Sequence, residues 1–197
     1  MFKRSLLFLI FIGLISCSNG YNKIPQELRD VNRLVKNIIP FKKCDYWCYA
    51  EGHFASSSDK IDIIYQVGEK PKSLKFKDPG PGLFVGCAPL LCYKYITYVN
   101  DGKVIYVNNA DDLKKFIGPV DNIEEALLIG LSDGLEIDND TRGGTYKVTD
   151  QGYELLLTHF INCPITKESV YLKFNKSGLI EKTPQSVFHK EKGCIVY

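Results

Sequence analysis

An apolar run close to the N-terminus, Leu6 to Ile15, constrains this chain more than any other feature. The run has ten residues, is broken only by Gly13, and follows Lys3 and Arg4. A membrane-spanning helix needs about 20 apolar residues, whereas a secretory signal peptide combines a basic start with an apolar segment of this length. We therefore interpret residues 1–16 as a signal peptide and expect the rest of the chain to fold in an oxidising compartment.

The run ends in the tetrapeptide Leu14-Ile15-Ser16-Cys17. This motif resembles the lipobox of bacterial lipoproteins, with an aliphatic residue three positions before the cysteine and a small one directly before it. The resemblance implies cleavage before Cys17, a diacylglycerol on its thiol and a palmitate-type acyl chain on its amine, because one chain alone gives only marginal anchoring. The alternatives are an ordinary signal peptide cut near Ser18 or Gly20, or an uncleaved anchor.

The same resemblance implies a location in the cell envelope, with the membrane as one partner. Ser18 stands where an aspartate marks inner-membrane retention in enteric bacteria, which favours the outer membrane, on its periplasmic or surface face. The whole chain has 25 basic and 23 acidic residues, and loss of Lys3 and Arg4 leaves 23 of each. A neutral domain excludes a strongly basic nucleic-acid binder and an acidic disordered chain, so no nucleic-acid partner is expected.

Six cysteines remain when Cys17 is assigned to the lipid: Cys44, Cys48, Cys87, Cys92, Cys163 and Cys194. An even number in an oxidising compartment predicts three disulfides. We predict that Cys163 pairs with Cys194. The other four would pair among themselves and tie the Trp47 region to the strand near Leu91. A zinc site with His53 is the weaker alternative, because exported thiolates tend to pair, and we expect neither a metal nor a cofactor.

Hydrophobic patterning predicts an α+β fold, with a mainly antiparallel sheet, about three helices and stabilising disulfides. We expect a lipidated tether at 17–25 and a single domain at 26–197. The expected helices are 26–39, 110–117 and 125–131, and the expected strands are 61–67, 74–76, 91–99, 103–108, 145–149, 153–162, 169–175 and 179–181.

Local signals fix some of the boundaries. Asp101-Gly102 between two aromatic-rich runs predicts a β-hairpin. Asn109 is expected to cap the helix at 110–117, and Asp121 with Glu124 resembles a capping box for the next helix.

The sequence contains no complete catalytic motif. Four acids of the segment after residue 132 (Asp133, Glu136, Asp138 and Asp140) and the strand residue His159 could serve a hydrolase, but solvated acids and a structural histidine are the simpler interpretation. An EF-hand counted from Asp138 fails, because Thr149 occupies the position that requires an acid.

Five aromatic residues are candidate binding residues: Trp47, Tyr93, Tyr95, Tyr98 and Tyr106. Tyr93 and Tyr95 fall on one face of their strand and Tyr98 on the other, which favours packing over one binding stripe. We expect a lipid-anchored, non-catalytic binding or interaction module with an envelope protein or glycan as partner. A hydrolase of an envelope polymer, using the loop carboxylates or His159, is the alternative.

Overall fold

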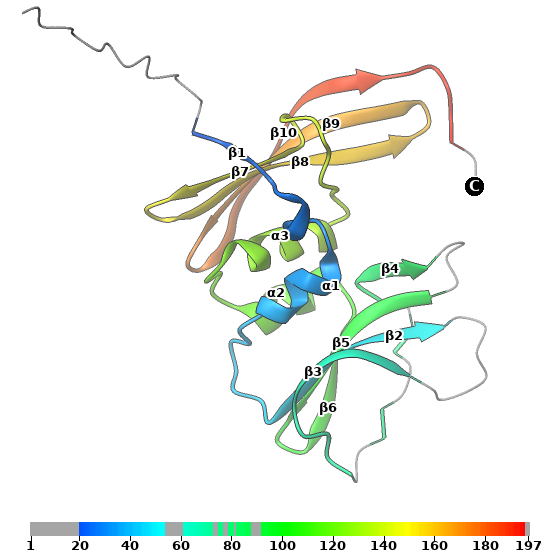
Figure 1. Ribbon diagram of the computed structural model, residues 1–197, viewed down its shortest axis with the longest axis vertical. Coiled ribbons are helices and arrows are strands. Elements are labelled where there is room, and N and C mark those ends of the chain that lie inside the picture. The colour runs from blue at the N-terminus through cyan, green and yellow to red at the C-terminus, as the bar shows by residue number, and fades with distance from the viewer. Residues whose placement is uncertain are drawn as a thin grey trace, which may run out of the picture.

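The protein is described by a computed structural model, and two antiparallel sheets enclose a layer of helices (Figure 1). The structure describes residues 20–53, 61–72, 75–76, 79–80, 82–87 and 92–195. The segment predicted to be a signal peptide and the predicted lipidation residue Cys17 lie outside these residues. The helical elements are η1 (Gln26–Leu28), α1 (Val31–Leu34), η2 (Val35–Asn37), α2 (Ala110–Ile117) and α3 (Ile123–Ser132).

Sheet A has the strand order β1-β7-β8-β9-β10, and sheet B has the order β3-β2-β5-β4, with β6 also paired to β5. The mainly antiparallel α+β prediction is confirmed. The strands are β1 (Asn22–Lys23), β2 (Tyr46–His53), β3 (Asp62–Gly68), β4 (Phe84–Cys87), β5 (Cys92–Asn100), β6 (Lys103–Val107), β7 (Gly144–Thr149), β8 (Gly152–Asn162), β9 (Ile165–Asn175) and β10 (Gly178–Lys190).

Helix α3 is the centre of the molecule, because it is covered on both sides. Its run from Glu125 to Gly130 is entirely buried, as expected of a helix enclosed between two sheets. Gly130 allows the close approach to sheet A: a Cβ there would lie 2.6 Å from Cδ1 of Leu157. The helix therefore joins the inner faces of both sheets into one main core.

Both of the longer helices begin at asparagine caps. Asn109 accepts a 3.0 Å hydrogen bond from the amide of Asp112, which confirms the predicted cap. For α3 the prediction is wrong by one residue, since Asn122 is the cap. Glu125, rather than Glu124, reaches back to the amide of Asp121 at 2.8 Å.

The helix expected over 26–39 is interrupted. Asp30 caps α1 by accepting from the amide of Asn32, so the segment divides into η1, α1 and η2. The apolar spacing still has its expected effect, because Leu34, Val35 and Ile38 are buried in the main core. The cap at Asp30 separates η1 from α1, but it does not change which side chains face the core.

Sheet B has a second core on the face that points away from the helices. Tyr46, Cys48 and Ala50 pack there with Tyr95 and Phe76, while Trp47 and Tyr49 of the same strand face the helix layer. The expected hairpin at Asp101-Gly102 is confirmed, with Asn100 opposite Lys103 and positive φ at both turn residues. Strand β2 was missed in sequence, and it continues to His53, where a loop was expected from Gly52.

The outer face of sheet A carries alternating charges. The register places Lys147 opposite Glu154, Glu154 opposite Lys173, and Lys173 opposite Glu181. Opposite charges on neighbouring strands support the pairing of β7 to β10. Strand β10 is much longer than the predicted 179–181, because it follows β9 with three irregularities in register.

The fold begins before the expected boundary at Gln26. Asn22 and Lys23 form β1 against Tyr146 and Thr145 of β7, and Ile24 is 1% exposed in the main core. Residues 22–24, which the sequence assigned to a tether, are therefore part of sheet A and of the main core. Among the described residues, no helix has the length and apolar character to cross a bilayer.

Candidate ligand-binding pocket

An open pocket of about 400 Å³ lies where α2, β5 and the segment after η2 meet. The size falls in the range of small-molecule sites. Aromatic rings from three separate parts of the chain form its walls, and two lysines stand among them. Its lining residues are Phe41, Lys42, Tyr98, Lys115, Phe116 and Gly118.

The aromatic wall is built from β5 and α2 together. The rings of Tyr98 and Phe116 are tilted against each other with centroids 5.1 Å apart. Behind them the buried Trp47 meets Phe116 edge to face at 5.7 Å and Tyr65 at 5.4 Å. Such aromatic contacts hold the rings in defined positions beyond simple burial.

Phe41, in the segment that follows η2, forms another wall of the pocket. Its amide donates a 2.8 Å hydrogen bond to the carbonyl of Phe116, while its side chain remains 61% exposed. Gly118 makes this approach available: its φ is +70°, and a Cβ there would lie 2.5 Å from Cβ of Phe41. The glycine that ends α2 thus also shapes the pocket.

The pocket combines this apolar wall with positive charge. Lys115 forms a 2.9 Å ion pair with Asp112, and its hydrogen bond, followed by that of Asn109, lowers the pKa of Asp112. Lys42 is exposed and forms no ion pair among the described residues. Burial, and next the neighbouring Cys44 and Asp112, raise the pKa of Tyr98, so its hydroxyl stays neutral at physiological pH.

Only one of the five aromatic residues singled out in the sequence lines this pocket. Tyr98 does so, and Trp47 supports the wall from behind with 3% exposure. Tyr93, Tyr95 and Tyr106 belong to the second core on the opposite face of sheet B. As predicted, Tyr93 and Tyr95 lie on one face of the strand and Tyr98 lies on the other.

Four lining residues were not singled out in the sequence: Phe41, Lys42, Lys115 and Phe116. Phe116 lies on the apolar side of an amphipathic helix, which predicts only that it is buried. An aromatic residue directly after Pro40 and before two lysines was a usable signal, since that segment cannot continue the helix.

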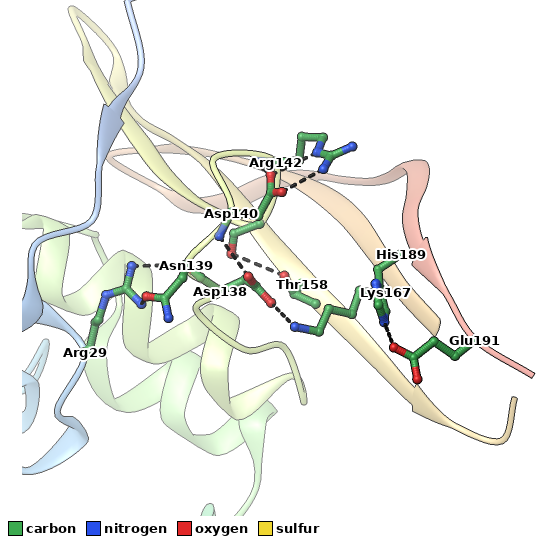
Figure 2. A network of polar contacts seen from close by, with 10 residues as sticks. Arg29, Asp138, Asn139, Asp140, Arg142, Thr158, Lys167, His189 and Glu191 are labelled. Atoms are coloured by element: carbon green, nitrogen blue, oxygen red, sulfur yellow. Dashed lines mark hydrogen bonds and ion pairs between the residues drawn. The ribbon is translucent and has the colours of Figure 1, made fainter. Parts of the chain in front are cut away.

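The acidic loop at 138–140 forms a polar cluster with residues of neighbouring elements (Figure 2). Asp138 accepts from Nζ of Lys167 at 2.7 Å and from the amide of Asp140 at 2.8 Å. Arg29 donates to the carbonyl of Asp138 and to the side chain of Asn139. The cluster therefore links η1 to β9 through the loop.

Three of the four acids singled out in this loop, Asp133, Asp138 and Asp140, are paired with cations. Burial raises the pKa of Asp138, but the hydrogen bonds from Asp140 and Lys167 outweigh it, and the net shift is downward. Asp133 pairs with Lys114 at 3.0 Å and Lys182 at 3.3 Å. Asp140 pairs with Arg142 at 2.7 Å. These contacts make Asp133, Asp138 and Asp140 structural ion-pair partners.

The two histidines of sheet A lie outside the pocket, and His189 is opposite Lys167 in the register of β9 and β10 (Figure 2). His159 is exposed on β8, with Nδ1 3.6 Å from a carboxylate oxygen of Glu168. His189 on β10 contacts Glu191 at 2.9 Å. Within the ranges that the structure describes, no three His, Cys, Asp or Glu residues are grouped as metal ligands would be.

One predicted disulfide, Cys163–Cys194, is confirmed. Cys44 and Cys48 carry free thiols, which corrects the expectation that they would join a framework of three bridges. The reason is geometric, because the side chain of Cys48 packs in the second core while half-buried Cys44 packs against the main core. Cys92 is disulfide-bonded and has Cys87 opposite it in the register of β4 and β5, but the side chain of Cys87 lies outside the described part.

Comparison of the chain with models of protein families, with curated proteins and with solved structures finds no match in any of the three.

Proposed function

We propose that this chain is a lipid-anchored, non-catalytic binding module of the cell envelope, and that the pocket under Phe41 takes an anionic glycan unit. The observation that carries the proposal is the combination of the Tyr98–Phe116 wall with Lys42 and Lys115 in one open pocket. The flat apolar face of a sugar ring suits aromatic walls, and a carboxylate suits lysines at the rim.

The lipid anchor is the second part of the proposal, and the lipobox ending at Cys17 supports it. Mass spectrometry of the N-terminal peptide from native membranes tests it directly. An acylated peptide beginning at Cys17 is expected, and the Cys17→Ser chain should lose the acyl groups. A peptide that begins beyond Cys17 without lipid would contradict the anchor.

Hydrolysis of an envelope polymer has less support. A general acid of that class keeps a raised pKa while facing the substrate. Burial raises the pKa of Glu125, but its two oxygens accept from the amides of Ile39 and Asp121, both at 2.8 Å. Its carboxyl group holds the start of α3 to the segment that leads into the pocket.

Two related sugars test the ligand class. N-acetylmuramic acid carries a carboxylate that N-acetylglucosamine lacks, so chemical shifts at Phe41, Tyr98 and Phe116 should follow titration with the acid far more than with the neutral sugar. The chain starting at Ser18 keeps every described residue and is suitable for this measurement.

Charge-removing variants supply the control. Lys42→Gln with Lys115→Gln should weaken binding of the acidic sugar about tenfold or more, at about 1 kcal/mol for each charged contact. Lys103→Gln with Lys192→Gln removes the same charge from exposed positions outside the pocket and should leave binding unchanged. Equal binding of both sugars, or equal losses in both double variants, would rule out the proposed ligand.

A further inference from the structure

Strand β1 fixes the start of the fold to the edge of sheet A. The amide of Ile24 donates to the carbonyl of Gly144 at 2.9 Å, and Ile24 is buried in the main core. The hydroxyl of Tyr21 donates to Glu154 at 2.8 Å, and Lys147 stacks on the Tyr21 ring. The chain is therefore held by the domain from Tyr21 onwards.

Little chain remains between this fixed point and the lipobox cysteine. Four residue steps separate Cys17 from Tyr21, and a fully extended chain spans about 3.3–3.6 Å for each, or about 14 Å in all. A lipid on Cys17 would therefore hold the β1 edge within about 14 Å of the membrane surface. That is close to the thickness of one helix with its side chains, about 10–12 Å, so the domain has no room to stand clear of the headgroups.

The strand order of sheet A then distinguishes two orientations. Strand β10 is four strand spacings from β1, or about 19 Å. If the sheet stands on its β1 edge, β10 points away from the membrane. If it lies flat, its whole outer face meets the membrane.

Charge favours the edge. Lys23 is exposed and forms no ion pair among the described residues, and Val148 nearby on β7 is 61% exposed. Lys147 adds a second positive charge. Glu154 compensates part of it from a distance of 4.0 Å. Across the outer face, by contrast, the row from Lys147 to Glu181 alternates lysine with glutamate and carries no excess positive charge.

We propose that the anchor edge, formed by Tyr21, Lys23, Lys147 and Val148, rests on the anionic phospholipid headgroups of the membrane that holds the Cys17 lipid. Sheet A stands on this edge, with β10 directed away from the bilayer. The inference rests on the proposed lipidation and does not depend on the glycan.

Lysine acetylation on vesicles tests the contact without altering the domain. The acylated protein is reconstituted into vesicles of phosphatidylethanolamine and phosphatidylglycerol, labelled, and compared by mass spectrometry with the Cys17→Ser protein in solution. Lys23 should be labelled several-fold more slowly on vesicles, and Lys147 should follow it. Lys190 and Lys192, at and beyond the end of β10, should be labelled equally in both samples.

Tether length supplies the matched control. A linker of about ten Gly and Ser residues inserted after Ser18 adds a mean reach of about 17 Å, and it should restore much of the labelling of Lys23. Equal labelling of Lys23 with and without vesicles would overturn the contact. Protection of Lys173 together with Lys23 would overturn the edge-on orientation. The intact mass of the N-terminal peptide separates these results from failure of the anchor, since absent acyl groups would overturn the lipidation and this inference together while leaving sugar binding open.

Discussion

The amide of Phe41 donates to the carbonyl of Phe116 over 2.8 Å, and this bond joins the segment after η2 to the last turn of α2. The two residues are 75 positions apart, yet their side chains form opposite parts of one pocket. Gly118 lies beneath Phe41 and makes the contact sterically allowed. Changes at this junction should affect binding more than they affect overall stability.

Gly118→Ala should therefore impair the pocket. The new Cβ would meet Phe41 at 2.5 Å in a backbone conformation that favours glycine, so we expect a loss of about 1–2 kcal/mol in stability and displacement of Phe41. Gly134→Ala is the matched control, because Gly134 also has positive φ, at +80°, but a Cβ there would have no neighbour within 4 Å. Sugar titration and urea unfolding of both variants separate the two effects. Equal loss of binding in both would show that the Phe41 contact is irrelevant.

Gly130→Ala should overpack the contact between α3 and sheet A. The added methyl would lie 2.6 Å from Leu157, which costs about 1–3 kcal/mol, partly offset by about 1 kcal/mol of helix propensity. A Leu157→Ala background removes the closest contact and leaves only Cδ1 of Leu172, at 3.0 Å, so the same substitution should then cost much less. Urea midpoints of the four chains measure the coupling. Additive effects would contradict the close approach.

Asp138→Asn should change the acid sensitivity of the fold. The pKa of Asp138 is lowered in the folded state, so its ionised form contributes stability that is present above the ordinary carboxyl pKa and lost as pH falls through that value and below it. The variant should be about 1–3 kcal/mol less stable at neutral pH and less dependent on pH below about 4. Asp111→Asn, with a side chain 84% exposed, should be nearly neutral. The measurement is the free energy of unfolding as a function of pH. Parallel curves for the wild type and Asp138→Asn would show that ionisation of Asp138 does not stabilise the fold.

Loss of the Cys163–Cys194 bridge should destabilise the C-terminal part of sheet A. A crosslink between residues 31 positions apart contributes about 3–4 kcal/mol in the chain-entropy model. Replacement of both cysteines by serine should lower the unfolding free energy by about this amount. Replacement of Cys44 by serine should cost much less, since that thiol is free. A double variant as stable as the wild type would show that the bridge adds nothing.

Local signals in the sequence predicted local structure well. The Asp101-Gly102 turn and the Asn109 cap each depend on residues a few positions apart, and both formed where expected. Asp30 shows the limit of such patterns, since its cap divided a segment whose apolar spacing suited one continuous helix. Strand β10 shows another, because its length depends on the ladder offered by β9 rather than on its own residues.

The pocket could not be predicted from the sequence for a related reason. Tyr98, Phe116 and Phe41 come from a strand, a helix and a connecting segment, and each taken alone is an ordinary core or surface aromatic residue. Cys48 was assigned to a disulfide by counting, but the face of β2 on which it lies places it opposite Thr97 in the second core. Faces and registers are properties of the assembled sheets, so residue counts could not supply them.

The pairing of β1 with β7 also orders events in time. Asn22 meets Tyr146, a residue made more than a hundred positions later, so the first strand to emerge has no partner until the second half of the chain is available. Until then the N-terminal segment has no strand to pair with. Pairing with β7 then fixes Asn22 and Lys23 to the sheet, and it leaves only four residue steps between Cys17 and the first contacts of Tyr21 with the domain.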